Sequence, residues 1–356
     1  MIRLYGYQGE TLIYRGPKTQ IYRGKCLDNA QPVLLKVLKV EYPTFAELVR
    51  FRNQYIIAKA LDLPGVVQPL ALEAYRNQYV LVLPDEGYVD LAAHFQPPIS
   101  LAEFFPLALQ LAQILQGLQQ HRVIHKDIKP QNILVHPETK HIKLTDFSLA
   151  SHLPKENPVL TNPQVIEGTL AYLSPEQTGR MNRGIDYRTD FYALGVTFYE
   201  LLTGQLPFQA IDSMALVHCH IAQQPQLPSV VNPAVHEGLC ALVLKLMAKM
   251  AEDRYQSAFG LRCDLEFCWQ VWRQQGQISA FVLGERDTCD RFNIPEKLYG
   301  REQEVTTLLA AFDRVSGTSD CESTEDNEST DNSESATHSE LILVAGFSGV
   351  GKTALV

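Results

Sequence analysis

Residues His125 to Asn132 read H-K-D-I-K-P-Q-N and precede a short apolar run, Ile133-Leu134-Val135. The stretch places a carboxylate at Asp127, an amine two residues later at Lys129 and an amide five residues later at Asn132. A carboxylate can orient a hydroxyl, an ammonium can neutralise negative charge, and an amide oxygen can bind a hard cation. This combination suits a reaction that needs positioning and charge stabilisation more than covalent chemistry, such as phosphoryl transfer.

Two further motifs follow in order, Asp146-Phe147-Ser148 and the run G-T-L-A-Y-L-S-P-E at residues 168–176. With the octapeptide, they resemble the catalytic loop, the metal-binding motif and the end of the activation segment of protein kinases. Lys129-Pro130 is more similar to the Ser/Thr branch than to the tyrosine branch. Chance could produce one His-Asp-Asn loop, but three ordered matches make coincidence a poor explanation. The resemblance implies an α+β, bilobal protein-kinase-like fold with a small β-rich lobe and a large helical lobe.

The resemblance also implies a role for each polar residue of the site. Asp127 would orient the substrate hydroxyl, and Lys129 would neutralise charge on the transferred phosphoryl group. Asn132 and Asp146 would hold Mg²⁺. Lys36 would pair with the α and β phosphates of ATP, although a lysine at the end of an apolar strand is by itself common at protein surfaces. ATP and Mg²⁺ are therefore the expected cofactors.

The small lobe is expected to span about residues 1–86. Short strands are predicted at Leu12–Tyr14, Ile21–Gly24 and Val33–Leu38. Alignment with the glycine loop of kinases puts its three glycine positions at Tyr14, Gly16 and Thr19, of which Gly16 alone is a glycine. Side chains at the other two positions restrict how closely backbone N–H groups can approach the phosphates. Only Gly16 remains to allow a close approach, so ATP binding is expected to be weaker than with three glycines.

A helix predicted from Thr44 to about Leu61 would present a side chain to Lys36. Where kinases carry a glutamate, this sequence has Gln54. The lysine–glutamate ion pair of kinases then becomes a neutral hydrogen bond between Lys36 and Gln54. A charge-assisted bond is stronger than a neutral one by about 1 kcal/mol, which would change the rate by up to about tenfold. Glu47, earlier on the same helix, is the alternative partner.

The adenine base is expected to meet a hinge after the buried strand Tyr79–Leu83. Leu83 would control access to the back of the pocket, Pro84 would offer its carbonyl, and Glu86 would offer its backbone N–H. Proline is tolerated at a position that contributes only an acceptor.

Four residues of the large lobe, predicted over about residues 87–273, are expected to support the site. Thr169 would bond the catalytic Asp and Lys, which favours Ser or Thr as the acceptor. Asp190 would bond back to the backbone of the catalytic loop, and Arg254 would pair with Glu176.

Residues 274–297 are predicted to be a linker, and residues 298–356 resemble the start of an AAA-type ATPase. A strand predicted over 340–345 runs into G-F-S-G-V-G-K-T, a P-loop pattern. This second nucleotide site would comprise Gly346, Gly351, Lys352 and Thr353. The following helix, the rest of the sheet and the second acid that a P-loop needs are not in this sequence, so an incomplete and inactive site is expected.

The run A-Y-L-S-P-E-Q-T-G-R-M-N-R at residues 171–183 narrows the resemblance. It is similar to the N-terminal kinase domain of bacterial multidomain signalling proteins, in which an AAA-type ATPase, a GAF sensor and a histidine kinase follow. The implied partners are a protein substrate with a Ser or Thr hydroxyl and the downstream signalling domains of a longer parent chain.

Composition limits the other classes of function. The chain has 356 residues and is 46% hydrophobic, which allows a large core and a further segment. Its net charge is −9, and residues 316–340 hold eight acidic residues and no Lys or Arg, so no nucleic-acid partner is expected. The Ser/Thr-rich stretch 316–339 is predicted to be a disordered insert, with a phosphorylated tail as the alternative. No membrane span is expected, and seven irregularly spaced cysteines favour a cytoplasmic location.

Two functions fit these observations. The first is a Ser/Thr protein kinase that transfers the γ-phosphoryl group of ATP to protein hydroxyls in bacterial signal transduction. The second is a catalytically weak or inactive kinase-like module that binds nucleotide or partners at the front of a larger ATPase–histidine kinase. The presence of all five polar catalytic positions favours the enzyme. Three departures from the kinase pattern favour the binding module: the thinned glycine loop, Gln54 in place of glutamate, and Ser148 in place of the glycine after Phe147.

Overall fold

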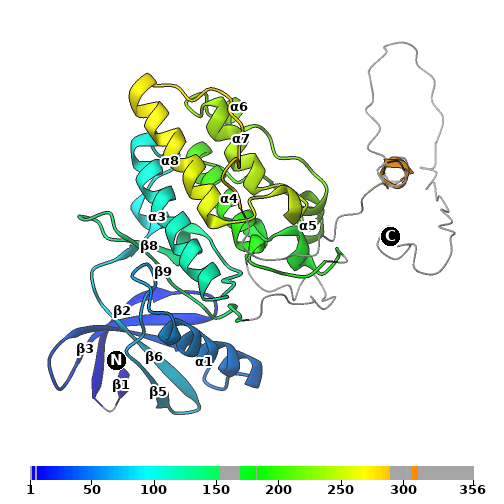
Figure 1. The fold of residues 1–356 in the computed structure, drawn as a ribbon. Helices are drawn as coiled ribbons and strands as arrows, with labels where there is room; N and C mark the ends of the chain where they lie inside the picture. Colours follow the sequence, from blue (N-terminus) through cyan, green and yellow to red (C-terminus); the bar gives the residue numbers. More distant parts are fainter. Residues whose placement is uncertain are drawn as a thin grey trace, which may run out of the picture. The chain divides into compact units, whose positions relative to one another are not determined.

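The computed structural model describes residues 2–4, 6–152, 169–181, 183–288, 303 and 306–311. The chain divides into two compact units, residues 1–293 and 294–356. The first unit has a small lobe built on a sheet and a large lobe built from helices (Figure 1), as the predicted bilobal fold requires. In the second unit the described residues are helical. The predicted P-loop residues and the acidic insert 316–339 lie outside the described residues.

Among the residues that the structure describes, an antiparallel sheet of six strands forms the small lobe. The strands are β1 (Ile2–Leu4), β2 (Tyr7–Arg15), β3 (Thr19–Cys26), β4 (Pro32–Leu38), β5 (Ala71–Tyr75) and β6 (Gln78–Pro84), in the order β1-β2-β3-β4-β6-β5. Alternation along β4 puts Val33, Leu35 and Val37 into an apolar cluster with side chains of β6. The same alternation turns Lys36 to the opposite face, where helix α1 (Phe45–Ala60) supplies its partner.

Helix α1 begins at a capping box. Glu47 N donates a hydrogen bond to Thr44 Oγ1 at 3.3 Å, and Glu47 Oε2 accepts hydrogen bonds from Thr44 N and Thr44 Oγ1 at 2.8 Å each. The bond from the Thr44 backbone, followed by that from its hydroxyl, lowers the pKa of the Glu47 carboxyl. Because Glu47 is engaged at the helix start, the alternative that it partners Lys36 is wrong.

The large lobe is organised around α3 (Leu101–Gln120) and α4 (Arg188–Thr203). Helix α3 starts at a capping box of Ser100 and Glu103, and α4 ends at Gly204, whose φ of 79° closes the helix. The other helices are α2 (Leu91–His94), α5 (Ser213–Ile221), α6 (Pro228–Val231), α7 (Glu237–Leu246) and α8 (Ala258–Gln275). Helix α3 packs against α8 and α4 packs against α7, which forms one continuous apolar core.

A small sheet lies beside the catalytic loop. Its strands are β7 (Val89–Asp90), β8 (Ile133–Val135) and β9 (Ile142–Leu144), in the order β7-β8-β9. Strand β8 is the apolar run that follows the octapeptide, and Ile133 and Val135 are buried. The loop is thereby anchored at its C-terminal end by a strand rather than by a flexible connection.

Among the described residues, helix α3 is long and apolar enough to cross a membrane, although no span is expected from the sequence. Its mean hydropathy is 1.2 over an 18-residue window, and 56% of that window is buried inside the protein. Phe104 and Phe105 are 0% exposed. The apolar surface of α3 therefore packs inside the large lobe, and length with hydropathy alone is weak support for a span.

Residues 276–288, inside the predicted linker, pack onto the large lobe. Ile278 is 2% exposed and lies in the core of this lobe. Asp287 Oδ1 accepts hydrogen bonds from Ser257 N at 2.8 Å and Ser257 Oγ at 2.7 Å, and its Oδ2 accepts one from Gln256 N at 2.7 Å. These bonds hold the segment at the N-terminus of α8, where a carboxylate is also favoured by the helix dipole. The described part of the predicted linker is therefore a fixed part of the lobe.

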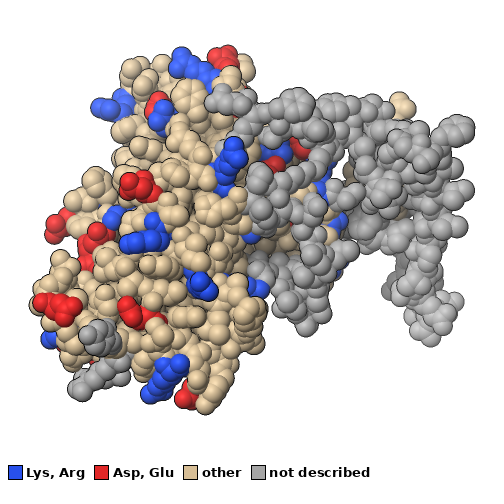
Figure 2. Space-filling view, turned by 60° about the horizontal axis from the view of Figure 1, so that its bottom comes forward, with Lys and Arg blue, Asp and Glu red and all other residues tan. Residues whose placement is uncertain are grey.

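Charged side chains of both signs are interspersed on the face of the protein seen in Figure 2. The described residues also include exposed ion pairs, such as Lys25 with Glu10 at 3.0 Å. A mixture of this kind produces only weak long-range fields.

Candidate active site

The catalytic loop brings the three polar residues of the octapeptide together. Lys129 Nζ lies 2.6 Å from Asp127 Oδ2 and 2.6 Å from Thr169 Oγ1. Asn132 Nδ2 donates hydrogen bonds to Asp127 Oδ2 at 2.9 Å and to the Asp127 carbonyl at 2.8 Å. The side chains of Lys129 and Asp127 are 17% and 11% exposed, so their charges interact more strongly than in bulk water. Two side chains thus bond the same oxygen of Asp127, Oδ2, which fixes the direction of the carboxylate.

Asp190 holds the backbone of this loop, as predicted. It is 2% exposed, and its Oδ2 and Oδ1 accept hydrogen bonds from His125 N and Lys126 N, both at 2.8 Å. Burial raises the pKa of the Asp190 carboxyl, while the charge of His125 and the two N–H groups oppose that rise. The His125 ring also packs edge-to-face on Phe147, with the ring centroids 4.7 Å apart, and so joins the loop to the metal-binding motif.

Lys36 meets both Gln54 and Asp146. Lys36 Nζ donates a hydrogen bond to Gln54 Oε1 at 3.1 Å and lies 3.1 Å from Asp146 Oδ2. Lys36 and Gln54 are 7% and 3% exposed. The predicted contact with an amide is therefore present, and Asp146 supplies the counter-charge that Gln54 cannot.

Asp146 carries an ionised oxygen that the protein leaves without a hydrogen bond. Burial alone would raise the pKa of this carboxyl, but the charge and the hydrogen bond of Lys36 outweigh burial and lower the pKa to about 2. Its Oδ1 is buried without a hydrogen-bond partner, and its φ of 63° lies in the left-handed region that costs an L-residue energy. A buried, unpaired and charged oxygen fits a ligand for a cation.

Asn132 and Asp146 fit a Mg²⁺ site by their donor chemistry. Asn132 uses its Nδ2 on Asp127, which leaves its Oδ1 for a cation. Thr145 N donates a hydrogen bond to the Asn132 carbonyl at 3.0 Å, so the residue next to Asp146 is tied to Asn132. Within the described ranges, no group of three or more His, Cys, Asp or Glu side chains forms a metal cage. Two oxygen donors suit Mg²⁺, which keeps several waters and takes further ligands from phosphates.

Gly16 lies in the turn between β2 and β3, where Gly16 N donates a hydrogen bond to the Thr19 carbonyl at 2.9 Å. The Tyr14 ring covers this glycine, because a Cβ added to Gly16 would lie 2.7 Å from Tyr14 Cε1. The glycine therefore has a second reason to be present, since any side chain there would displace the ring. Tyr14 occupies the first of the missing glycine positions.

Leu83 and Pro84 form the end of β6. Leu83 is 8% exposed and lines a small pocket with Gln54, Asp146 and Phe147. This places Leu83 between the backbone expected to bind adenine and the region behind the Lys36 contact.

The hinge after Pro84 is tied to both lobes. Asp85 Oδ2 pairs with Arg23 Nε of β3 at 2.6 Å, and Glu86 Oε2 pairs with Lys143 Nζ of β9 at 2.5 Å. Arg23 is 56% exposed at its side chain and Glu86 is 46% exposed, so each pair contributes little to stability. Their effect is to orient the hinge rather than to strengthen it.

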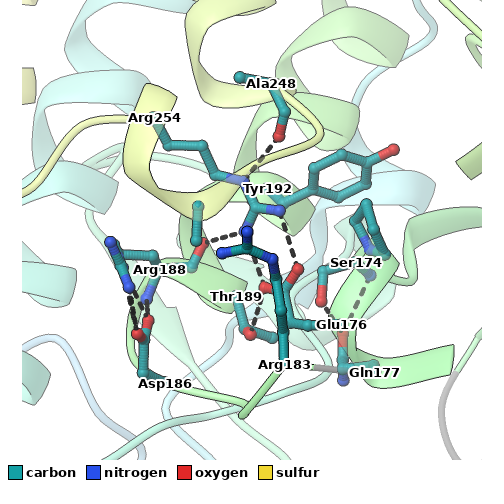
Figure 3. A network of polar contacts seen from close by, with 12 residues as sticks. Ser174, Glu176, Gln177, Arg183, Asp186, Arg188, Thr189, Tyr192, Ala248 and Arg254 are labelled. Atoms are coloured by element: carbon teal, nitrogen blue, oxygen red, sulfur yellow. Dashed lines mark hydrogen bonds and ion pairs between the residues drawn. The ribbon is translucent and has the colours of Figure 1, made fainter. Parts of the chain in front are cut away.

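Glu176 and Arg254 form the predicted pair in the large lobe (Figure 3). Arg254 Nη1 and Nη2 donate hydrogen bonds to Glu176 Oε1 and Oε2 at 2.7 and 2.8 Å, and Thr189 Oγ1 donates one to Glu176 Oε1 at 2.7 Å. Glu176 and Arg254 are 4% and 1% exposed. Burial alone would raise the pKa of Glu176, but Arg254 outweighs burial and lowers the pKa to about 2.

Gln177 touches the catalytic loop, a role that was not predicted from the sequence. Gln177 Nε2 donates a hydrogen bond to the Lys126 carbonyl at 2.9 Å. The S-x-x-Q spacing from Ser174 to Gln177 indicates a capping box and was visible in the sequence. The bond to Lys126 was not visible, because the two residues meet only in the folded chain.

Replacing Gln54 with glutamate is expected to raise the rate of nucleotide-dependent catalysis by up to about tenfold, because a charge-assisted bond to Lys36 replaces a neutral one. Steady-state kcat and KM for ATP would be measured for both proteins, with thermal melting to check that the new buried charge is tolerated. A lower rate in a variant that melts normally would mean that the amide is the better partner of Lys36.

Comparison with known proteins agrees with this geometry. The family model described as "Protein kinase domain" matches residues 7–261. The serine/threonine-protein kinase Pkn1 of Myxococcus xanthus is 32% identical over 263 residues, which cover 71% of this chain and 36% of Pkn1. PknB of Mycolicibacterium smegmatis is 32% identical over 266 residues, which cover 72% of this chain and 42% of PknB.

A third relative is the hybrid signal transduction histidine kinase G of Dictyostelium discoideum, 30% identical over 72% of this chain and 10% of the relative. The chain thus spans less than half the length of each of these relatives. From the match over residues 7–261 and the geometry of the site, the chain belongs to the protein kinase domain family.

Proposed function

We propose that this chain is a Ser/Thr protein kinase that transfers the γ-phosphoryl group of Mg-ATP to protein hydroxyls. The observation that supports it most is the contact of Lys129 Nζ with both Asp127 Oδ2 and Thr169 Oγ1. This contact joins the carboxylate expected to receive a proton to a threonine at the substrate side of the site. The names of Pkn1 and PknB support the same acceptor class.

ATP and Mg²⁺, when bound, supply the transferable phosphoryl group and a cation that neutralises its charge. Lys36 would bind the α and β phosphates, and Asn132 and Asp146 would hold the cation. Asp127 orients the substrate hydroxyl and accepts its proton as the oxygen attacks phosphorus. Lys129 stabilises the charge that develops on the transferred group. The products are a phosphoester and ADP, with the hydroxyl proton on Asp127.

Replacing Asp127 with asparagine is expected to lower phosphoryl transfer roughly a hundredfold or more, because the amide cannot accept the proton. Purified protein would be incubated with γ-labelled ATP, Mg²⁺ and a library of Ser- and Thr-containing peptides. Asp28→Asn, the same chemical change at an exposed turn residue, is the matched control. Equal incorporation by the wild type and Asp127→Asn would overturn the proposal.

The alternative is a kinase-like module that binds nucleotide and transfers nothing. The packing of Tyr14 on Gly16 and the neutral Gln54 support it, because both weaken the grip on phosphates. Stabilisation by ATP that depends on Mg²⁺, without any incorporation of label, is the outcome expected of such a module.

We further propose that the domain lies at the front of a longer cytoplasmic signalling protein that continues into an ATPase. The P-loop pattern at residues 346–353 and the small share of each relative that the chain covers support this. Antibody detection in cell fractions is the test. A native protein much larger than 40.0 kDa in the soluble fraction is expected, and a band near that mass would count against it.

A further inference from the structure

Gln177 joins the end of the activation segment to the catalytic loop. Its Oε1 accepts hydrogen bonds from Ser174 N and Ser174 Oγ at 3.0 Å each, and its Nε2 donates one to the Lys126 carbonyl at 2.9 Å. Figure 3 shows Gln177 beside Ser174 at the edge of the Glu176 and Arg254 network. One side chain therefore bridges segments 51 residues apart in the sequence.

The chemistry of the two neighbours dictates how this amide is oriented. The Ser174 N–H can only donate and the Lys126 carbonyl can only accept, so the oxygen must face Ser174 and the nitrogen must face Lys126. A carboxylate of the same shape could serve Ser174 but not Lys126. An amide is therefore the group that satisfies both sides.

The Lys126 carbonyl belongs to the peptide unit that leads into Asp127. Lys126 has a φ of 68°, in the left-handed region that is unfavourable for a residue with a side chain. Asp190 holds the N–H of Lys126 at 2.8 Å, and Gln177 holds its carbonyl. The strained residue is thus held at both ends. The peptide unit before Asp127 is bonded at its carbonyl by Gln177, at 2.9 Å, and at its N–H by His125 Nδ1, at the longer distance of 3.3 Å.

We propose that Gln177 is a positioning residue for phosphoryl transfer, which sets the orientation of Asp127 by holding the Lys126 carbonyl. The inference rests on the proposed kinase function and adds a regulatory consequence. The bond can form only when the turn Pro175–Thr178, which carries Gln177, is in place. The position of Asp127 is therefore coupled to the order of the activation segment's end through this amide, in addition to the contacts of Lys129 Nζ with Thr169 and Asp127.

Gln177→Glu tests the clamp, because it keeps both acceptor bonds to Ser174 and replaces the donor to Lys126 with an oxygen. At pH 7.5 kcat is expected to fall about ten- to hundredfold, while KM for ATP changes less than about twofold. As the pH is lowered toward 5, protonation of the new carboxyl restores a donor, so the ratio of variant to wild-type kcat should rise. Gln224→Glu, the same change at an exposed residue, should behave as wild type throughout.

Ser174→Ala separates the clamp from the cap of the turn. It removes the hydroxyl bond to Gln177 Oε1 and leaves the bond to Lys126, so kcat close to wild type is expected. If Ser174→Ala loses as much kcat as Gln177→Glu, the effect belongs to the turn and the proposal is overturned.

Hydrogen–deuterium exchange of the peptide covering residues 122–132 gives a readout that does not need activity. Faster exchange in Gln177→Glu than in wild type is expected, and unchanged exchange would overturn the clamp. If the wild type transfers phosphate and Gln177→Glu keeps its full kcat, the inference fails while the kinase function stands. If exchange rises in the variant but the wild type transfers nothing, the clamp stands and the kinase function fails.

Discussion

Replacing Arg254 with methionine is expected to lower the free energy of unfolding by about 3–5 kcal/mol, because it leaves the buried Glu176 carboxylate without its charged partner. Methionine fills most of the space of the arginine stem but supplies none of its five N–H donors. The carbonyls of Ala248, Lys249 and Arg188 lose donors as well. Urea unfolding followed by circular dichroism would measure the change, and a loss below about 1 kcal/mol would contradict the assignment.

The pH dependence distinguishes the lost ion pair from lost packing. Glu176 has a folded pKa of about 2, below its ordinary value of 4.5. In the wild type this carboxyl adds stability above pH 4.5 that disappears as the pH falls from 4.5 toward 2. In Arg254→Met the same burial is expected to raise the pKa of Glu176, because no cation opposes it. Lowering the pH then protonates the unpaired carboxyl and removes part of the variant's loss of stability. The difference in the free energy of unfolding between the wild type and Arg254→Met should therefore become smaller as the pH is lowered toward 4.5. A difference that stays constant would indicate that the variant loses only packing.

The double variant Glu176→Gln with Arg254→Met is the control for this prediction. Removing the buried charge together with its partner should restore part of the lost stability, because the cost lies mainly in the uncompensated carboxylate. Equal losses in the single and double variants would contradict that explanation.

Replacing Asp146 with asparagine is expected to reduce phosphoryl transfer by at least about 1,000-fold, because several kcal/mol of transition-state stabilisation depend on the metal it is predicted to hold. Asparagine has the same shape but lacks the charge that binds Mg²⁺ and pairs with Lys36. Initial rates at increasing Mg²⁺ would measure the effect, again with Asp28→Asn as the matched control. A variant within about tenfold of wild type at saturating Mg²⁺ would exclude Asp146 as the metal ligand.

The protonation of Asp146 predicts how this site responds to acid. Because the Lys36 ammonium holds the pKa of Asp146 at about 2, below its ordinary value of 3.8, the carboxylate stays ionised from pH 8 down to pH 5. Its contribution to stability is present above pH 3.8 and is lost only as the pH falls toward 2. Titration of Asp146 is therefore not expected to change the activity between pH 8 and pH 5.

Elements with local causes followed from the sequence. The helix predicted from Thr44 to about Leu61 is present as α1, and its capping box depends on side chains only three residues apart. The strand predicted at Val33–Leu38 is present as β4, and its alternation separates Lys36 from the apolar cluster of the small lobe. The order of three short motifs indicated a protein kinase, which the match over residues 7–261 confirms at the level of the family.

Elements with distant causes did not follow. Strand β1 pairs with β2, and β5 pairs with β6, but neither outer strand has a pattern long enough to be recognised alone. Asp287 holds the segment 276–288 at the start of α8. No local sequence pattern predicts this contact. Length and hydropathy alone do not distinguish helix α3 from a membrane span, whereas its burial inside the large lobe is a property of the folded chain.

The sequence by itself determined the family, the order of the lobes and which residue types reach the active site, because motif order and apolar periodicity are properties of the chain alone. Only the tertiary structure decided that Gln54 and not Glu47 meets Lys36, that Tyr14 covers Gly16, and that Gln177 grips the loop before Asp127. The physical reason is that a side chain's partner depends on its direction in space, and that direction is set by the packing of segments far apart in the sequence.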